Sequence, residues 1–266
     1  MTRALDGGAV LAAADFLAHL RRHPQIVDDI PEPFRPATLD DGYRVQAALI
    51  DRLLPPGSRC VGFKVACTNR IAQQALAIDR PLFGRLLAHA VHGDGAVLTA
   101  ADFTHRVIES EFAFRIGRDV PRRPDGHSVD TVADCIDAVV PAIEIVDHRF
   151  VSWTVGAPQV AADNAIHGCW VRGRALTDWR DLDLAGAAVR VCRNGALTST
   201  GSGSAVLGHP LEVMRFLADE LPRFGLDLRA GDLVTTGVTT DVFEADAGDS
   251  LVAEFDGVGT VAVNFV

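Results

Sequence analysis

Glu109 and Glu111 are the residues of this sequence whose type and spacing point most directly to chemistry. Residues 108–116 alternate like an extended strand, so the two carboxylates project from the same face. At that spacing they repel each other unless a cation, a proton or a cationic side chain lies between them. The pair could bind a hard divalent ion, Mg²⁺ or Mn²⁺, or it could lie on a solvated strand face, where alternating glutamates are common.

Glu144 is a third carboxylate, and it lies among isoleucine and valine in a second predicted strand, residues 142–146. An unpaired ionised carboxylate is strongly disfavoured in an apolar setting, so Glu144 needs a partner. One prediction is a metal site shared with the two glutamates of the first strand, which would leave coordination positions for water and substrate. The alternative is an ion pair with Arg115 or Arg149.

Lys64 lies among apolar residues of a predicted strand, residues 62–66. A lysine in such a place can have a lowered pKa and act as a base, or it can stay charged and hold an anionic substrate group. The alternative is an edge lysine whose ammonium extends to water. His148 and His167 are weaker acid–base candidates, with a surface or a hydrogen-bonded core histidine as the alternative.

The glycine-rich residues 201–208 superficially suggest a phosphate-binding loop. They do not form a phosphate loop, because no Lys-Ser or Lys-Thr follows, and their glycine spacing does not fit a dinucleotide site. His209 precedes Pro210 and is predicted to start a helix, since no second histidine stands at metal-ligand spacing.

These candidate residues follow a helical N-terminal segment. Two apolar stripes of helical period predict one helix ending before Pro24 and another beginning after Thr38. Pro55-Pro56-Gly57 ends the pattern. We therefore expect a helical N-terminal segment over residues 1–57 and a β-rich catalytic domain over residues 58–266.

The β-rich part consists of short extended runs separated by turn residues, with some helices between them. We expect a helix over residues 69–78 capped by Thr68, and another from Ser128 through Val140 that Pro141 stops. The fold class predicted is α+β. The C-terminal strands are expected at residues 233–236, 251–255 and 259–265.

Composition limits the partners of the protein. A net charge of −10 over 266 residues argues against a nucleic-acid or anionic-membrane partner. No apolar run approaches membrane-spanning length and no signal peptide begins the chain, which favours the cytoplasm. Five scattered cysteines without Cys-x-x-Cys spacing indicate neither a disulfide framework nor a zinc site.

Taken together and in order, six motifs resemble the fumarylacetoacetate hydrolase superfamily, in its 2-keto-4-pentenoate hydratase and 4-oxalocrotonate decarboxylase branch. They recur over about residues 38–266, and together they are specific for the superfamily. The N-terminal helices favour this branch over the shorter carbon–carbon hydrolases. The matching stretches are residues 62–68, 108–114, 141–147, 162–165, 206–210 and 228–237.

The resemblance implies a role for each matching residue. Glu109, Glu111 and Glu144 match the metal-binding carboxylates of the family, with Mg²⁺ or Mn²⁺ expected, and Lys64 matches a lysine placed near substrate. It also implies a mixed β-roll core and a homo-oligomer. His167 is a further proton carrier that we predict from its place in the matching segment.

The chain departs from the pattern of the family at two places. Leu82 stands where relatives commonly carry an aspartate, and Ile166-His167 replaces small polar residues. Both changes bear on substrate shape and proton transfer rather than on the metal ligands.

The resemblance implies a metal-dependent hydratase, a lyase that adds water to a 2-hydroxy-2,4-dienoate or its 2-oxo-enoate tautomer in the degradation of aromatic compounds. Three alternatives stay open. The protein could decarboxylate a 2-oxo-enedioate such as 4-oxalocrotonate, or it could hydrolyse a carbon–carbon bond of an acylpyruvate. It could also be a catalytically silent homologue that binds a small acid.

Overall fold

The computed structural model describes residues 4–152 and 155–266. Within these residues no helix is long and apolar enough to cross a membrane. The α-helices are α1 (Gly7–Arg22), α2 (Leu39–Leu53), α3 (Arg70–Ala75), α4 (Val129–Ala133), α5 (Ala157–Ala162) and α6 (Leu211–Glu220). The strands are β1 (Cys60–Ala66), β2 (Leu82–Leu87), β3 (Val91–Gly93), β4 (Ala96–Leu98), β5 (Val107–Ile116), β6 (Ile136–Val146), β7 (His167–Arg172), β8 (Ala188–Arg193), β9 (Ala196–Ser202), β10 (Leu233–Thr235), β11 (Phe243–Glu244), β12 (Ser250–Phe255) and β13 (Gly259–Phe265).

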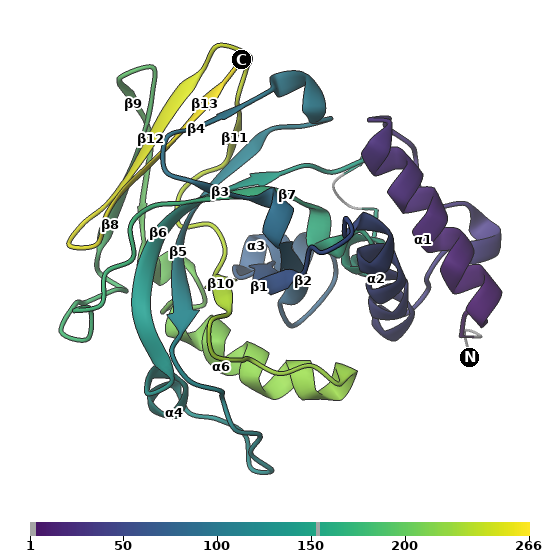
Figure 1. The fold of residues 1–266 in the computed structure, drawn as a ribbon, viewed down its shortest axis with the longest axis horizontal. Coiled ribbons are helices and arrows are strands. Elements are labelled where there is room, and N and C mark those ends of the chain that lie inside the picture. The colour runs from purple at the N-terminus through teal and green to yellow at the C-terminus, as the bar shows by residue number, and fades with distance from the viewer. Residues whose placement is uncertain (1–3, 153–154) are drawn as a thin grey trace.

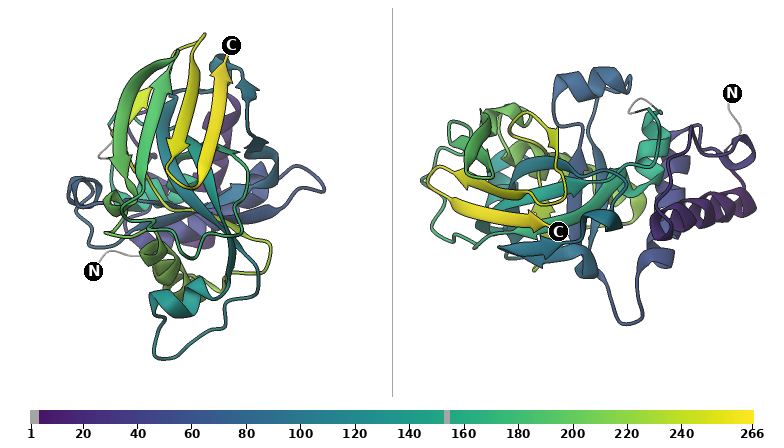
Figure 2. Two further views of the ribbon diagram at one scale, coloured as in Figure 1. Left: turned by 90° about the vertical axis from the view of Figure 1, so that its left-hand side faces the viewer. Right: turned by 90° about the horizontal axis from the view of Figure 1, so that it is seen from above.

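Two mixed sheets form the body of the protein (Figure 1). An eight-stranded sheet has the order β2-β1-β10-β5-β6-β7-β3, with β11 pairing on β5, and a five-stranded sheet has the order β4-β13-β12-β8-β9. Figure 2 shows the five-stranded sheet as a separate layer at one side of the molecule. This is the α+β fold of mixed sheets and helices that the sequence predicts.

The main core lies between the two sheets because β5 and β6 turn one apolar face toward the five-stranded sheet. Phe112 and Phe114 of β5 are fully buried, and the Phe112 ring meets Phe255 of β12 edge-on with centroids 5.0 Å apart. Alternate residues of β5 therefore lie on opposite faces of the sheet, as predicted. The apolar set enters the core, and the glutamates project from the opposite face.

Helices α1 and α2 form the head of the molecule, at the right of Figure 1. The Thr38 side chain caps α2 by accepting a hydrogen bond from the Asp41 backbone N–H at 3.2 Å, as the pattern after Thr38 predicts. The head shares a core with Phe150 and Ala162 of the body. Helix α2 packs on α5, so the head lies against the segment that leads into β7.

The predicted helix from Ser128 through Val140 is wrong in its second half. Ser128 caps α4 as expected, but the helix ends at Ala133 and β6 begins at Ile136. The β-branched residues of this stretch pair with β5, where Ile116 lies opposite Ile136, and this tertiary pairing prevails over the helical pattern.

Pro141 therefore lies within a strand rather than at the end of a helix. Pairing of β6 with β7 stops at Ala142, so Pro141 lies at the limit of that ladder, where a missing N–H is tolerated. The carbonyl of Pro141 still accepts a hydrogen bond from the Gly173 N–H at 2.8 Å.

The helix predicted over residues 69–78 is shorter and has a different cap. It spans Arg70–Ala75, and the Asn69 side chain accepts the capping hydrogen bond from the Ala72 N–H. Ala77 has a positive φ of 51°, which a helix cannot continue through.

Candidate active site

Three carboxylates meet on the face of the eight-stranded sheet that points away from the main core. Glu109 of β5 lies directly opposite Glu144 of β6 in the antiparallel ladder, and Glu111 follows two residues along on the same face. One oxygen from each of the three lies within 4.8 Å of the others. Such a spacing suits oxygen ligands of a divalent cation.

The solvated strand face that was the alternative for these glutamates is not what the structure shows. Glu111 and Glu144 are fully buried, and Glu109 is half-buried. Burial raises the pKa of Glu109 to about 7 and raises that of Glu111 well above its usual value, with the neighbouring carboxylates adding to the effect. Without a cation, the ionised cluster is therefore unfavourable.

Lys64 reaches the same cluster from β1. Its Nζ lies 3.2 Å from Oε1 of Glu144 and donates a hydrogen bond of 3.0 Å to the carbonyl of Ala165. Burial alone would lower the pKa of Lys64, but the three glutamates outweigh it and raise the pKa. Lys64 is thus a buried ammonium rather than an edge lysine, and it is the only lysine in the sequence.

His167 opens β7 and also contacts Glu144. Its Nδ1 lies 2.8 Å from Oε1 of Glu144, while its Nε2 is buried without a hydrogen-bond partner among the described residues. Burial lowers the pKa of His167 more than the carboxylate raises it, so the ring is neutral. A neutral imidazole whose Nδ1–H donates to Glu144 leaves Nε2 as a proton acceptor.

Glu144 itself is held ionised. Burial would raise its pKa, but the charge of Lys64 and the hydrogen bond from His167 prevail and lower it. Its second oxygen, Oε2, and both oxygens of Glu111 are buried and have no hydrogen-bond partner within the described residues.

These residues fit a divalent cation. When all three carboxylates are ionised, as ligands of a cation are, they and one ammonium carry a net charge of −2, which a divalent ion neutralises. The buried oxygens of Glu111 and Glu144 that lack donors are the atoms such an ion would satisfy. The assignment of these ligands stays a prediction.

The two departures from the family pattern come together beside this cluster. Leu82 of β2 is fully buried, and it lies two residues from Gly84, which pairs with Lys64. Leu82 and Ile166 belong to one apolar cluster, together with Val160 of α5. Leu82 therefore places an apolar side chain on the strand face that carries Lys64.

Other residues considered from the sequence lie elsewhere. Arg115 pairs with Asp137, and Arg149 pairs with Asp147 and Asp163, so neither is the partner of Glu144. The His148 ring stacks on His105 with centroids 4.0 Å apart. The His209 Nδ1 accepts a hydrogen bond from the Leu211 N–H at the start of α6, which confirms its helix-start role.

Sequence reasoning missed the residues that position the site residues through hydrogen bonds. The carbonyl of Ala165 binds Lys64, and Arg21 of α1 contacts Asp163 and the backbone of His167. Asp163 lies in a motif that the resemblance marks, which was the only available signal for it. A backbone carbonyl has no signature in the sequence. Arg21 lies 142 residues before Asp163, so no local motif connects the two.

Comparison of the whole chain with known proteins agrees with the fold. Residues 62–266 match the family model described as fumarylacetoacetate (FAA) hydrolase C-terminal, and the chain belongs to this family. The resemblance predicted from the six motifs is thereby confirmed.

Individual relatives fall in the predicted branch. The chain is 32% identical over 253 residues to a 2-keto-4-pentenoate hydratase of Paraburkholderia xenovorans (strain LB400), covering 95% of this chain and 93% of the relative. It is 30% identical over 270 residues to a 4-oxalocrotonate decarboxylase of Pseudomonas putida, covering both chains fully. Among solved structures, 4-oxalocrotonate decarboxylase from Pseudomonas putida G7, complexed with magnesium and adipate, superimposes with a TM-score of 0.93 at 28% identity over the whole of both chains.

Proposed function

We propose that this protein is a divalent-metal-dependent hydratase, a lyase that adds water to a 2-hydroxy-2,4-dienoate and yields a 4-hydroxy-2-oxo acid. One observation carries the proposal. A buried cluster of three carboxylates holds a charged lysine and a neutral histidine on the same oxygen of Glu144. Relatives at 32–33% identity named 2-keto-4-pentenoate hydratase and 2-hydroxyhexa-2,4-dienoate hydratase support the substrate class.

Glu109, Glu111 and Glu144 would hold the cation, and Mg²⁺ or Mn²⁺ suits an all-oxygen site. The buried oxygens without donors support this assignment, as does the magnesium in the similar decarboxylase structure. When bound, the cation supplies positive charge that stabilises the negative charge developing on the C2 oxygen of the substrate.

Lys64 holds the substrate and does not act as a base. Its raised pKa keeps it an ammonium, and contacts with Ala165 and Glu144 use two of its three N–H donors. The third can donate to the carboxylate or the C2 oxygen of the substrate. The structure thus favours the anion-holding role over the lowered-pKa role that the sequence left open.

His167 accepts a proton. With Nδ1–H bound to Glu144, its Nε2 can take a proton from water as the water oxygen bonds to C4. The first step moves the proton of the C2 hydroxyl to C5 and gives the 2-oxo-3-enoate. In the second step water adds across C3 and C4, and C3 gains the proton.

The reaction is tested by incubating the purified protein with Mg²⁺ and 2-hydroxypenta-2,4-dienoate and following products by NMR. Formation of 4-hydroxy-2-oxopentanoate that stops on chelation of the metal supports the proposal. No consumption of the dienoate at any Mg²⁺ or Mn²⁺ concentration would exclude it.

Decarboxylation of 4-oxalocrotonate is the second candidate. The 4-oxalocrotonate decarboxylase of Pseudomonas putida, 30% identical over the whole of both chains, supports it. The superposition on 4-oxalocrotonate decarboxylase also supports it. Release of CO₂ from 4-oxalocrotonate without formation of hydrated product would assign the protein to this reaction.

Location and assembly are further parts of the proposal. We infer a cytoplasmic protein, because Cys60, Cys67, Cys135, Cys169 and Cys192 are free thiols, as is usual in reducing compartments. We also infer a homo-oligomer, as the family resemblance implies. Light scattering coupled to size-exclusion chromatography measures the mass, and a value near the 28.4 kDa of one chain would contradict the oligomer.

A further inference from the structure

The turn that joins α5 to β7 has an unusual backbone. Asn164, Ala165 and Ile166 have φ values of 55°, 50° and 55°, in the left-handed region that side chains with a Cβ rarely adopt. Three such residues in succession persist only where their surroundings hold them. This left-handed turn, residues 164–166, is therefore a candidate for a functional constraint.

The left-handed turn contacts or leads into both side chains that meet Glu144. Its central residue, Ala165, offers the carbonyl that accepts the hydrogen bond from Lys64 Nζ at 3.0 Å. Its end leads directly into His167, whose Nδ1 lies 2.8 Å from Glu144. A shift of this turn would therefore move the ammonium and the imidazole together.

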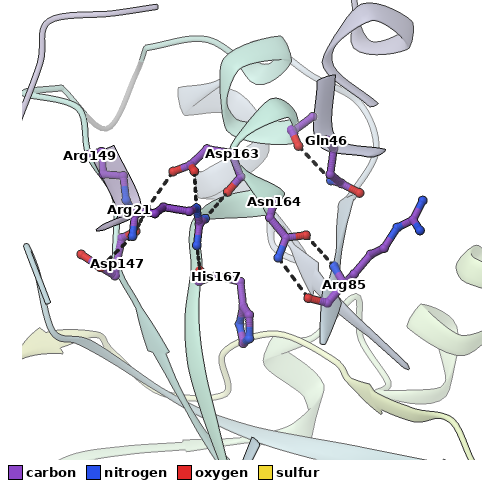
Figure 3. Close-up of polar contacts among 9 residues, drawn as sticks. Arg21, Gln46, Arg85, Asp147, Arg149, Asp163, Asn164 and His167 are labelled. Carbon is purple, nitrogen blue, oxygen red and sulfur yellow. Dashed lines mark hydrogen bonds and ion pairs between the residues drawn. The ribbon is translucent and has the colours of Figure 1, made fainter. Parts of the chain in front are cut away.

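One side of the left-handed turn is fixed on β2. The Asn164 side chain accepts a hydrogen bond from the Arg85 N–H at 2.7 Å and donates one to the Arg85 carbonyl at 3.0 Å (Figure 3). Gly84 allows the approach, because a Cβ there would lie 2.4 Å from the Asn164 carbonyl oxygen.

The other side is held by Arg21 from helix α1. Its Nε donates to the Asp163 carboxylate at 2.8 Å, its Nη2 to the Asp163 carbonyl at 2.7 Å, and its Nη1 to the His167 carbonyl at 2.8 Å (Figure 3). One guanidinium thus bridges the residue before the left-handed turn and the residue after it. Only 11% of the Arg21 side chain is exposed, so these bonds are shielded from water.

Asp163 is fixed by a second arginine. Arg149 donates to the other carboxylate oxygen of Asp163 at 3.0 Å and to Asp147 at 2.8 Å. Asp147 in turn accepts hydrogen bonds from the backbone N–H groups of Thr104 and His105, just before β5. The network therefore connects the head to both strands that carry the glutamates.

We propose that Arg21 is a positioning residue, which closes the left-handed turn and so sets where Lys64 and His167 stand relative to Glu144. The helical head is then part of the catalytic apparatus and not only a packing partner. The inference rests on the roles proposed above for Lys64 and His167. A structural role alone, in docking α1 on the body, would leave the geometry of the lysine unchanged.

The test uses the fact that Lys64 is the only lysine. Protein labelled with [¹⁵N]lysine has a single lysine side-chain nitrogen, so its NMR resonance reports the surroundings of Lys64 without substrate. Arg21→Met removes the bridging guanidinium and keeps the apolar stem. We expect a displaced resonance and a kcat reduced on the order of 10–100-fold, with KM changed much less, because small misplacements act on the transition state.

Arg52→Met is the matched control. Arg52 pairs with Asp15 and donates to the Ala48 carbonyl within the head, without contacting the left-handed turn. We expect the wild-type resonance and kcat in this variant. If Arg21→Met does not fold, Arg21→Gln, which keeps an amide donor, takes its place.

An unchanged lysine resonance and kcat in the Arg21 variant would overturn the proposal. Equal changes in the Arg52 variant would also overturn it, since they would reflect docking of the head in general. The resonance is independent of turnover, so a wild-type protein that fails to hydrate the dienoate would refute the proposed function while the position of Lys64 is still decided.

Discussion

Glu144 occupies the centre of the site because one of its oxygens serves two side chains. Lys64 and His167 both contact Oε1, while Oε2 is buried without a hydrogen-bond partner among the described residues. The two partners nevertheless differ in protonation, because the glutamates keep Lys64 an ammonium while burial keeps His167 a neutral imidazole. Pairs of titratable groups whose environments separate their pKa values are typical of acid–base sites.

The buried carboxylates should cost stability when no metal is bound. Burial raises the pKa of Glu111, so at pH 8 its ionised form disfavours the folded state. Glu111→Gln removes that charge, and we expect the metal-free protein to unfold about 2–4 °C higher, as for roughly 1 kcal/mol of added stability. Differential scanning calorimetry in the presence of a chelator measures the change.

Glu254→Gln provides the control for this variant, since Glu254 lies in a half-exposed pair with Arg190. Its unfolding temperature should stay within about 1–2 °C of wild type, as expected for a surface pair. The Glu111 variant should also lose the stabilisation that Mg²⁺ gives to wild type. If the metal-free Glu111 variant unfolds at a lower temperature than metal-free wild type, the buried charge does not destabilise the folded state.

His148 should make the protein sensitive to mild acid. Burial and the neighbouring His105 lower the pKa of His148 to about 4, so the unfolded chain binds this proton first as the pH falls. The contribution of His148 to the free energy of unfolding is therefore fully present above about pH 6.5. It is lost as the pH falls from there to about 4, and it changes no further at lower pH. A shift of this size corresponds to about 3 kcal/mol, which solvent screening of the ring reduces to a loss on the order of 1–2 kcal/mol.

Urea unfolding of wild type and His148→Gln between pH 8 and pH 4 checks this expectation. As the pH falls across that interval, the free energy of unfolding of wild type should decrease more than that of the variant. Parallel curves would show that His148 does not contribute to acid sensitivity.

At the scale of elements, the strands carry most of what sequence could predict. The alternation in β5 places the apolar residues in the core and the glutamates on the other face, because one face of each strand is buried. The helix predicted through Val140 failed because α-helical spacing and a buried strand look alike over a short apolar run. Pairing with β5 decides between them, and that pairing is not visible in the local sequence.

Gly84 tests the contact between β2 and the left-handed turn. A Cβ at Gly84 would lie 2.4 Å from a backbone oxygen, which has no flexible end to move away. Gly84→Ala should therefore lower the free energy of unfolding by about 1–3 kcal/mol. Urea unfolding measures it, and turnover should fall as well because the turn carries the acceptor for Lys64.

Gly93→Ala is the matched control for this change. A Cβ at Gly93, at the end of β3, meets nothing within 4 Å, so its effect should stay within about 0.5 kcal/mol. Equal stability of the two variants would mean that the turn yields to the added methyl group.

At the scale of the whole molecule, the site residues lie on four strands of the eight-stranded sheet, β1, β5, β6 and β7. The helical head lies at one end of the molecule (Figure 1). The sheet supplies the carboxylates and Lys64, and the head contacts the turn that leads to His167 through Arg21. The other face of the sheet is covered by the five-stranded layer. Rigid elements therefore support the cluster from both sides, as a preorganised site requires.

The sequence could predict the candidate residues of the site but not what holds them. The sequence predicts five candidate residues, and the structure brings them together: Glu109, Glu111, Glu144, Lys64 and His167. The bridges made by Arg21 and by the Ala165 carbonyl depend on distances across the fold, and a single sequence carries no sign of them. The direction of the Lys64 pKa shift likewise follows only from the three glutamates beside it in the fold.

The most direct measurement is a titration of turnover with Mg²⁺ in wild type, Glu109→Gln and Glu144→Gln, together with calorimetric binding of Mg²⁺ to each. We expect wild type to bind one ion per chain and to convert 2-hydroxypenta-2,4-dienoate only when the ion is present. Both variants should lose binding and turnover together. Retention of either function in the variants, or turnover by wild type in excess chelator, would contradict the metal-dependent site.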